Sequence, residues 1–114
     1  MSGITTHVLD TSRGRPAAGV LVTLEVQSAD GAWKALGSGT TDADGRLRNL
    51  FPSGAALAAG TYRLTFDTAA YFRAQSAESF YPRVEVVFTV RDASQHYHVP
   101  LLLSPFGYST YRGS

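Results

Sequence analysis

Hydrophobic and polar residues alternate along three stretches of the chain, 20–27, 62–67 and 84–91. This two-residue period is typical of a β-strand with one buried face, and the helical period is absent from the first stretch. We therefore predict three strands. Their apolar positions are Val20, Val22, Leu24 and Val26 in the first, Tyr62, Leu64 and Phe66 in the second, and Val84, Val86, Phe88 and Val90 in the third.

Two Asp-Gly dipeptides, 30–31 and 44–45, lie between the first two of these stretches. Glycine and aspartate tolerate the positive φ angles that tight turns require, so both dipeptides predict hairpin turns. Residues 33–41 and 46–50 then form short strands between and after the turns.

Residues 68–79 are the one segment with helical character. The segment is rich in alanine, Thr68 is a candidate N-cap, and Pro82 lies beyond the end. One short helix among many short strands indicates an all-β sandwich of two antiparallel sheets. No linker or internal repeat divides the sequence, so we expect residues 1–114 to form a single domain.

Composition narrows the class of protein further. A chain of 114 residues can bury roughly 60% or more of its unfolded surface without disulfides. It contains no cysteine, which excludes disulfides, Cys-ligated zinc and a thiol nucleophile. Ten basic and nine acidic residues give a net charge of +1 without a basic run, so we expect no nucleic-acid partner.

Hydropathy along the chain gives no indication of a membrane or secretory segment. No stretch approaches about 20 consecutive apolar residues, and residues 1–7 combine neither a basic region nor an apolar run. We therefore expect a soluble, cytoplasmic protein that does not interact with membranes.

The last nineteen residues, 96–114, are unusually rich in histidine, tyrosine and apolar side chains for a chain end. Alternation over 96–103 puts two histidines on one face of a strand. Because Pro100 cannot donate to a ladder, we predict an edge strand or a bulge there. An edge strand with apolar residues on both faces needs covering, and a partner subunit would cover it.

The three histidines of the chain, His7, His96 and His98, are candidates for acid–base chemistry near neutral pH. His96 and His98 are two positions apart on one strand and therefore point the same way. For each histidine taken alone, a polar residue on the outer face of a sheet is the preferred interpretation. A His-only zinc site would require the fold to bring His7 beside the other two.

Arg46 directly follows the turn at 42–45, a position that would hold its guanidinium for recognition of a planar, carbonyl-rich group. An ordinary solvated arginine is equally compatible. The turn itself is not a calcium loop, because its register puts Thr40 and Phe51 at ligand positions. No Gly-x-Ser-x-Gly motif occurs, so water is a more plausible nucleophile than serine.

Five blocks of this sequence resemble the transthyretin-related 5-hydroxyisourate hydrolases, in order and over nearly the full chain. They are residues 7–10, 14–17, 41–46, 79–82 and 96–114. The first half is shared with other prealbumin-like binding domains and is weakly specific. The terminal Tyr-Arg-Gly-Ser, residues 111–114, is the hallmark of the hydrolases, and transthyretin lacks it.

The resemblance implies a prealbumin-like sandwich of two four-stranded antiparallel sheets with one short helix. It also implies a homotetramer with active sites in the channel between dimers, and no metal or cofactor. The site residues it implies are His7, Arg46, His98 and Tyr111, completed by Arg112, Gly113 and Ser114, with His7, Arg46, His98 and Ser114 as the catalytic set.

The reaction that the resemblance implies is hydrolysis of a cyclic amide of 5-hydroxyisourate to 2-oxo-4-hydroxy-4-carboxy-5-ureidoimidazoline, a step of urate degradation. Either His7 or His98 would remove a proton from the attacking water, and the sequence leaves open which one. His96 is expected to matter less. The alternatives are a transthyretin-like carrier of a small hydrophobic ligand and a purely structural sandwich domain.

Overall fold

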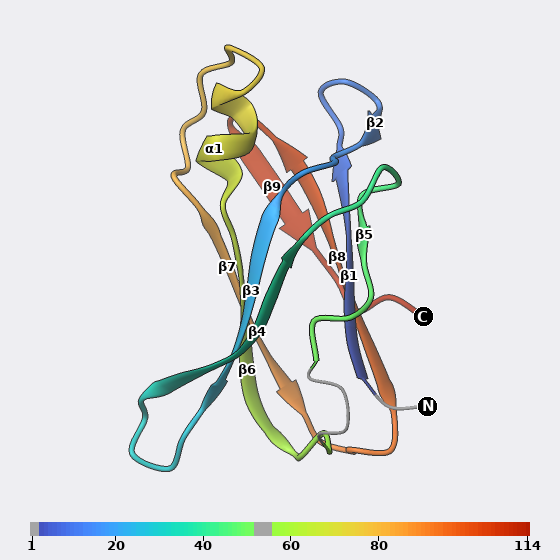
Figure 1. The fold of residues 1–114 in the computed structure, drawn as a ribbon, viewed down its shortest axis with the longest axis vertical. Helices are drawn as coiled ribbons and strands as arrows, with labels where there is room; N and C mark the ends of the chain where they lie inside the picture. Colours follow the sequence, from blue (N-terminus) through green and yellow to red (C-terminus); the bar gives the residue numbers. More distant parts are fainter. Residues whose placement is uncertain (1–2, 52–55) are drawn as a thin grey trace.

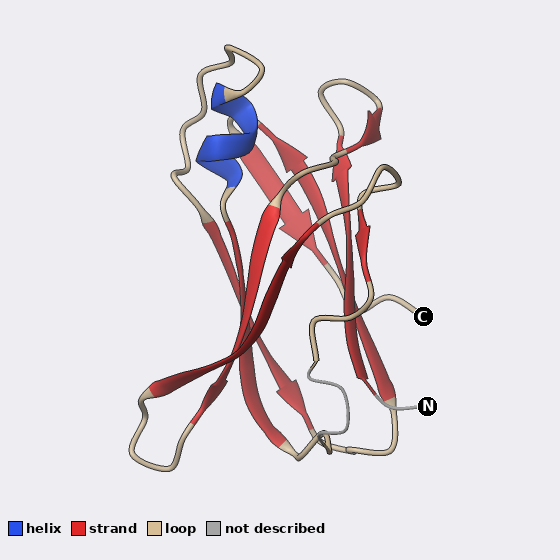
Figure 2. Cartoon of the chain, viewed as in Figure 1, coloured by secondary structure: helices blue, strands red, loops and turns tan. Residues whose placement is uncertain are grey.

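Two β-sheets face one another, and a short helix lies at one end of them (Figures 1 and 2). The computed structural model describes residues 3–51 and 56–114. Strands make up most of the structure and pair in two sheets, so the predicted sandwich is confirmed.

The first sheet contains the strands from the two ends of the chain. Its order is β2-β1-β8-β9, and β5 pairs with β1 as well. The strands are β1 (Gly3–Asp10), β2 (Arg15–Pro16), β5 (Arg46–Leu47), β8 (His96–Ser104) and β9 (Gly107–Thr110).

One pair of this sheet differs from the antiparallel arrangement predicted for both sheets. Strands β1 and β8 pair in parallel, from Gly3 opposite His96 to Asp10 opposite Leu103. A parallel pair requires a crossover connection, and here the entire second sheet and the helix lie between the two strands in sequence. The first sheet also has five strands instead of four, because the two-residue β2 and β5 both pair along β1.

The second sheet is antiparallel throughout, with the order β4-β3-β6-β7. Its strands are β3 (Leu21–Gln27), β4 (Trp33–Thr40), β6 (Gly60–Phe66) and β7 (Val84–Val90). Gly31 has a φ of 88° in the turn between β3 and β4, which confirms the first predicted Asp-Gly turn. The predicted strand over 46–50 is shorter than expected, since β5 ends at Leu47.

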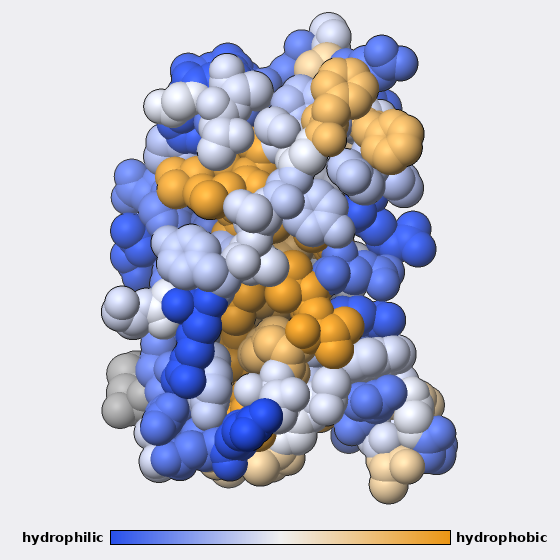
Figure 3. All heavy atoms as spheres, turned by 180° about the vertical axis from the view of Figure 1, so that it is seen from behind, coloured by the Kyte–Doolittle hydropathy of each residue, from blue (hydrophilic) through white to orange (hydrophobic). Residues whose placement is uncertain are grey.

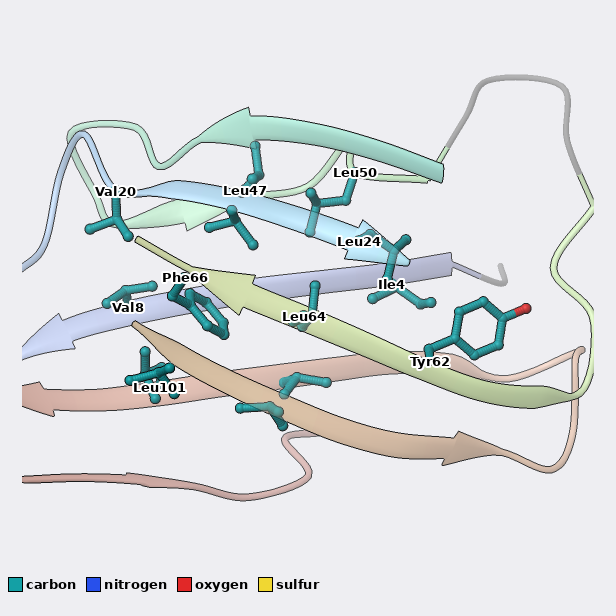
Figure 4. Packing of buried hydrophobic residues seen from close by; sticks show 14 of the residues in the cluster. Ile4, Val8, Val20, Leu24, Leu47, Leu50, Tyr62, Leu64, Phe66 and Leu101 are labelled. Atoms are coloured by element: carbon teal, nitrogen blue, oxygen red, sulfur yellow. The ribbon is translucent and has the colours of Figure 1, made fainter. Parts of the chain in front are cut away.

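The core lies between the sheets and consists of the alternating apolar residues (Figure 4). Leu24, Leu64 and Phe66 of the second sheet are fully buried, as are Val8 and Leu101 of the first. The faces of β1 and β8 that point away from the core carry the side chains that alternate with these buried residues. The core therefore fixes which residues of these two strands point outward.

The helix α1 (Thr68–Arg73) is shorter than the predicted 68–79. Asp67, not Thr68, is the N-cap, and its carboxylate accepts a hydrogen bond from the Ala70 amide at 3.2 Å. The helix ends early because Ser76 adopts a left-handed φ of 57°, a common helix stop. In the described part of the chain, no helix is long and apolar enough to cross a membrane.

The prediction of an edge strand at 96–103 is wrong, because β8 lies between β1 and β9. Pro100 is tolerated there for a local reason. The Gly113 amide donates to the His98 carbonyl at 2.8 Å, and the Thr110 hydroxyl donates to the Pro100 carbonyl at 2.7 Å. Backbone groups of residues 98 and 100 thus point toward the C-terminal segment. The pairing is interrupted at this point, since β9 ends at Thr110 and only the isolated bridge between His98 and Gly113 follows.

Candidate active site

Three of the predicted site residues, His7, Arg46 and His98, lie on the outer face of the first sheet. In the strand pairing, Arg46 is opposite His7 and His98 is opposite Thr5, two positions from His7 on β1. The two neighbouring residues on β1, Thr6 and Val8, point into the core. The sheet therefore brings a guanidinium and two imidazoles from three separate strands onto one surface.

The turn at 42–45 fixes the position of Arg46. Asp42 accepts hydrogen bonds from the Asp44 amide at 2.9 Å and the Arg46 amide at 3.0 Å. The second of these bonds is the largest cause of the lowered pKa of Asp42. Gly45 has a φ of 75°, and a Cβ there would come within 2.4 Å of the Val8 carbonyl oxygen. Only glycine fits this turn, which confirms the second predicted Asp-Gly turn.

His7 is oriented by a backbone carbonyl of the same turn. Its Nε2 lies 2.9 Å from the Asp44 carbonyl oxygen. A carbonyl can only accept a hydrogen bond, so Nε2 carries the proton. In neutral His7 the free lone pair is therefore on Nδ1.

His98 is half-buried and is held from two sides. Its Nδ1 lies 2.8 Å from the Thr5 hydroxyl. On the other side, a Cβ at Gly113 would come within 2.6 Å of His98 Cδ2. Burial is the largest cause of a lowered pKa of His98, and the positive charges of Arg46, His7 and His96 lower it further. The His98 ring is therefore neutral at pH 7 and can accept a proton.

The C-terminal residues divide into two groups. Gly113 contacts His98, whereas the Arg112 guanidinium lies 4.4 Å from the centre of the Tyr97 ring and donates to Gln95 at 2.9 Å. Because Tyr97 is buried and alternates with His98 along β8, Arg112 lies away from the histidine surface. Tyr111, together with Arg112, lines a cavity of about 290 Å³ beside β7.

Ser114 is exposed at the chain end. The predicted roles of Tyr111, Arg112 and Ser114 therefore stay predictions, since Gly113 is the residue of the terminal tetrapeptide that lies against the His98 ring, and Arg112 reaches only the backbone carbonyl of His96, at 3.5 Å.

The alternative of a His-only zinc site finds no support in the geometry. Among the described residues, no group of three or more His, Asp or Glu side chains is placed to hold a metal ion. A hydroxyl lies between His96 and His98 instead: Thr5 Oγ1 is 2.9 Å from His96 Nε2 and 2.8 Å from His98 Nδ1.

Sequence reasoning missed Thr5 and the Asp44 carbonyl as partners of the histidines. One signal was available, because Thr5 is two residues from His7 and shares its face of the strand. The parallel register that places Thr5 opposite His98 is a long-range feature without a local sequence pattern.

Comparisons with known proteins agree with this fold. The profile of the HIUase/Transthyretin family matches residues 4–113. A probable 5-hydroxyisourate hydrolase of Caenorhabditis elegans is 53% identical over 113 residues, which cover 99% of this chain and 82% of the relative.

Solved structures of two kinds resemble the chain. The 5-hydroxyisourate hydrolase of Klebsiella pneumoniae has a TM-score of 0.86 at 40% identity, with 100% of both chains covered. Sea bream transthyretin, solved in complex with thyroxine, has a TM-score of 0.90 at 38% identity, with 96% of this chain and 93% of the other covered. The match over nearly the whole length identifies the chain as a member of the HIUase/transthyretin family.

Proposed function

We propose that this protein hydrolyses 5-hydroxyisourate to 2-oxo-4-hydroxy-4-carboxy-5-ureidoimidazoline. The observation that carries the proposal is the half-buried His98 on one surface with Arg46 and His7. This set combines a proton acceptor, a guanidinium on a backbone held by the turn and a second imidazole, groups suited to hydrolysis of a cyclic amide. The hydrolase names of the relatives from worm and bacterium support the same substrate.

In the proposed mechanism, His98 is the general base. Its neutral ring takes a proton from water while the water oxygen attacks the ring carbonyl carbon of the substrate. Its lowered pKa keeps it in the accepting form at pH 7. A positioned base of this kind typically contributes roughly 10²- to 10⁴-fold to the rate.

Arg46 and His7 act on the other atoms of the amide. The Arg46 guanidinium donates hydrogen bonds to the carbonyl oxygen as negative charge develops on it. The carbon–nitrogen bond then breaks, and His7 in its doubly protonated form gives its Nδ1 proton to the leaving nitrogen. Because the Asp44 carbonyl holds the Nε2 proton, Nδ1 is the nitrogen of His7 that exchanges protons in this step.

The terminal residues complete the site in this proposal. The Gly113 backbone lies against the His98 ring and sets its orientation. Tyr111, Arg112 and Ser114 are proposed to contact the substrate or to hold the C-terminal segment against it.

A homotetramer is proposed as the functional assembly. Strands β9 and β7 are the end strands of their sheets. Residues of both strands line one cavity, so the two strands lie along the same side of the sandwich. Unpaired strand edges are ready to pair with a second copy. Seen from behind, the molecule also carries a strip of hydrophobic surface bordered by polar residues (Figure 3).

The main alternative is a small-ligand carrier, which the likeness to a thyroxine-bound transthyretin favours. A spectroscopic assay separates the two functions. Freshly generated 5-hydroxyisourate loses its ultraviolet absorbance slowly by itself. We expect the wild-type protein to accelerate this loss. His98→Asn, in the same assembly state, should accelerate it much less. Absence of any acceleration by the wild type would favour the carrier.

A further inference from the structure

The hydroxyl of Thr5 joins two histidine rings of β8. Thr5 Oγ1 lies 2.9 Å from His96 Nε2 and 2.8 Å from His98 Nδ1, both ordinary hydrogen-bond distances. The parallel register of β1 and β8 sets Thr5 opposite His98. The two rings and the hydroxyl thus form a continuous chain of three groups on the outer face of the sheet.

A hydroxyl has one proton, so it cannot donate to both rings at once. In one arrangement Thr5 donates to His98 Nδ1 and accepts from the protonated Nε2 of His96. In the other arrangement Thr5 donates to His96 Nε2 and accepts from the protonated Nδ1 of His98. The protonation of the two rings is therefore linked through this hydroxyl.

We propose that Thr5 relays protons between His98 and the more exposed His96, so that the positive charge His98 gains on accepting a proton passes to His96. This inference rests on the proposed function for its place in the reaction. After His98 Nε2 takes the proton of water, the ring is positively charged. The Nδ1 proton then moves to Thr5 Oγ1 while the Thr5 proton moves to His96 Nε2, so the positive charge passes to His96. When His98 Nε2 later releases its proton to solvent, the two transfers run in reverse and restore the His98 tautomer whose Nε2 can accept a proton.

The surroundings of the two rings set the direction of the relay. His98 is half-buried and faces Arg46 from β5, His7 from β1 and His96 from β8, and the C-terminal segment places the uncharged Gly113 backbone against it. His96 is exposed. A positive charge is consequently better solvated on His96 than on His98.

Neither Thr5 nor His96 touches the reacting atoms in this scheme, so both are positioning residues. Thr5→Val removes the hydroxyl and keeps the branched shape, whereas Thr5→Ser keeps the hydroxyl. Thr65→Val is the matched control, because Thr65 lies on a strand of the other sheet, opposite Thr23 and Glu85.

The first measurement requires no substrate. Ring ¹⁵N chemical shifts report which nitrogen of each histidine carries a proton. We expect Thr5→Val to change the ring signals of both His96 and His98, and Thr5→Ser and Thr65→Val to leave them close to wild type. Unchanged His96 and His98 signals in Thr5→Val would overturn the relay.

The second measurement is the rate of 5-hydroxyisourate hydrolysis across pH. We expect kcat of Thr5→Val to fall about 10- to 100-fold, as for the loss of groups that orient functional histidines, with recovery in Thr5→Ser. Combining Thr5→Val with His96→Asn should cost less than the product of the two single losses. Equal kcat and equal pH profiles in Thr5→Val and wild type would also overturn the relay.

The two measurements separate the relay from the proposed function. A wild-type protein without hydrolase activity would contradict the proposed function, and the ring signals would still decide whether Thr5 links His96 and His98.

Discussion

His7 and His98 face the same surface, but their hydrogen-bond partners differ in kind. His7 Nε2 lies against the Asp44 carbonyl, whereas His98 Nδ1 lies against the Thr5 hydroxyl. A carbonyl only accepts, so it fixes one proton on His7. A hydroxyl both donates and accepts, so it leaves His98 free to exchange its proton.

This difference shows how two identical side chains acquire different roles. A histidine with one fixed tautomer is suited to donate a proton from one particular nitrogen. A histidine hydrogen-bonded to a hydroxyl is suited to change between its protonation states. The two partners also arise differently. The Asp44 carbonyl belongs to a tight turn, whereas the Thr5 hydroxyl lies on a strand that pairs with a segment distant in sequence.

The largest effect is expected for His98→Asn. Loss of the general base should lower kcat/KM by about 10³-fold, while His7→Asn should cost about 10²-fold, since only leaving-group protonation is lost. Hydrolysis rates measured at equal protein concentration test the difference, and gel filtration checks that both variants keep the wild-type assembly. An equal loss in both variants would contradict the assignment of distinct roles.

Arg46→Ala removes the guanidinium that lies beside both rings. We expect kcat to fall by about 10²-fold, because a donor to the developing oxyanion is lost. The positive charge of Arg46 also lowers the pKa of His98, so this pKa should rise toward its ordinary value in Arg46→Ala. An NMR titration of the ring signals measures that rise, and no change in the His98 titration would refute the electrostatic contact.

Gly113→Ala tests the other side of His98. The added methyl would come within 2.6 Å of Cδ2, so the ring or the C-terminal segment must shift and the contact that positions His98 is disturbed. We expect about a tenfold loss in kcat, the equivalent of about 1.4 kcal/mol, without loss of folding. Gly107→Ala is the matched control, because its methyl would come no closer than 3.7 Å to a neighbouring side chain.

The pH dependence of the wild type should carry the signature of His98. Its lowered pKa predicts an acid limb of kcat/KM with an apparent pKa below 6.5. The same shift affects stability: the unfolded chain binds this proton more readily, so the contribution of His98 is complete above pH 6.5 and is lost as pH falls through the folded pKa. His98→Asn should flatten both profiles, and an unchanged acid limb would assign it to another group.

The smallest effect is expected for Asp44→Ala. His7 contacts the backbone carbonyl of this residue and not its side chain. We expect kcat/KM within about twofold of wild type and stability within about 0.5 kcal/mol, as measured by hydrolysis rates and thermal unfolding. A large loss in kcat/KM would mean that the exposed carboxylate, and not the carbonyl, orients His7.

Local pattern predicted most of the fold. The alternation over 20–27, 62–67 and 84–91 identified strands of the second sheet because their inward positions are buried apolar residues. The helix was predicted too long, because its stop is a non-glycine residue, Ser76, in the left-handed region. The central place of β8 was missed because it depends on pairing with strands distant in sequence.

The site was predicted to a similar extent and for similar reasons. The two-residue spacing of His96 and His98 correctly placed both rings on one face of β8. The family resemblance named His7, Arg46 and His98, and the sheet register brings them together. Thr5 was not singled out, because its spacing from His7 places it on the same face of the strand but does not reveal His98 as its partner before the strand pairing is known.

The parallel pairing of β1 with β8 has a consequence for the biogenesis of the protein. Thr5 and His98 are separated by 93 residues, so the surface that holds the histidines forms only when the first and last parts of the chain meet. A growing chain on the ribosome has no such surface until β8 has been synthesised and can pair with β1. Loop closure over this distance is entropically costly and slows folding, so acquisition of activity would report completion of the whole fold.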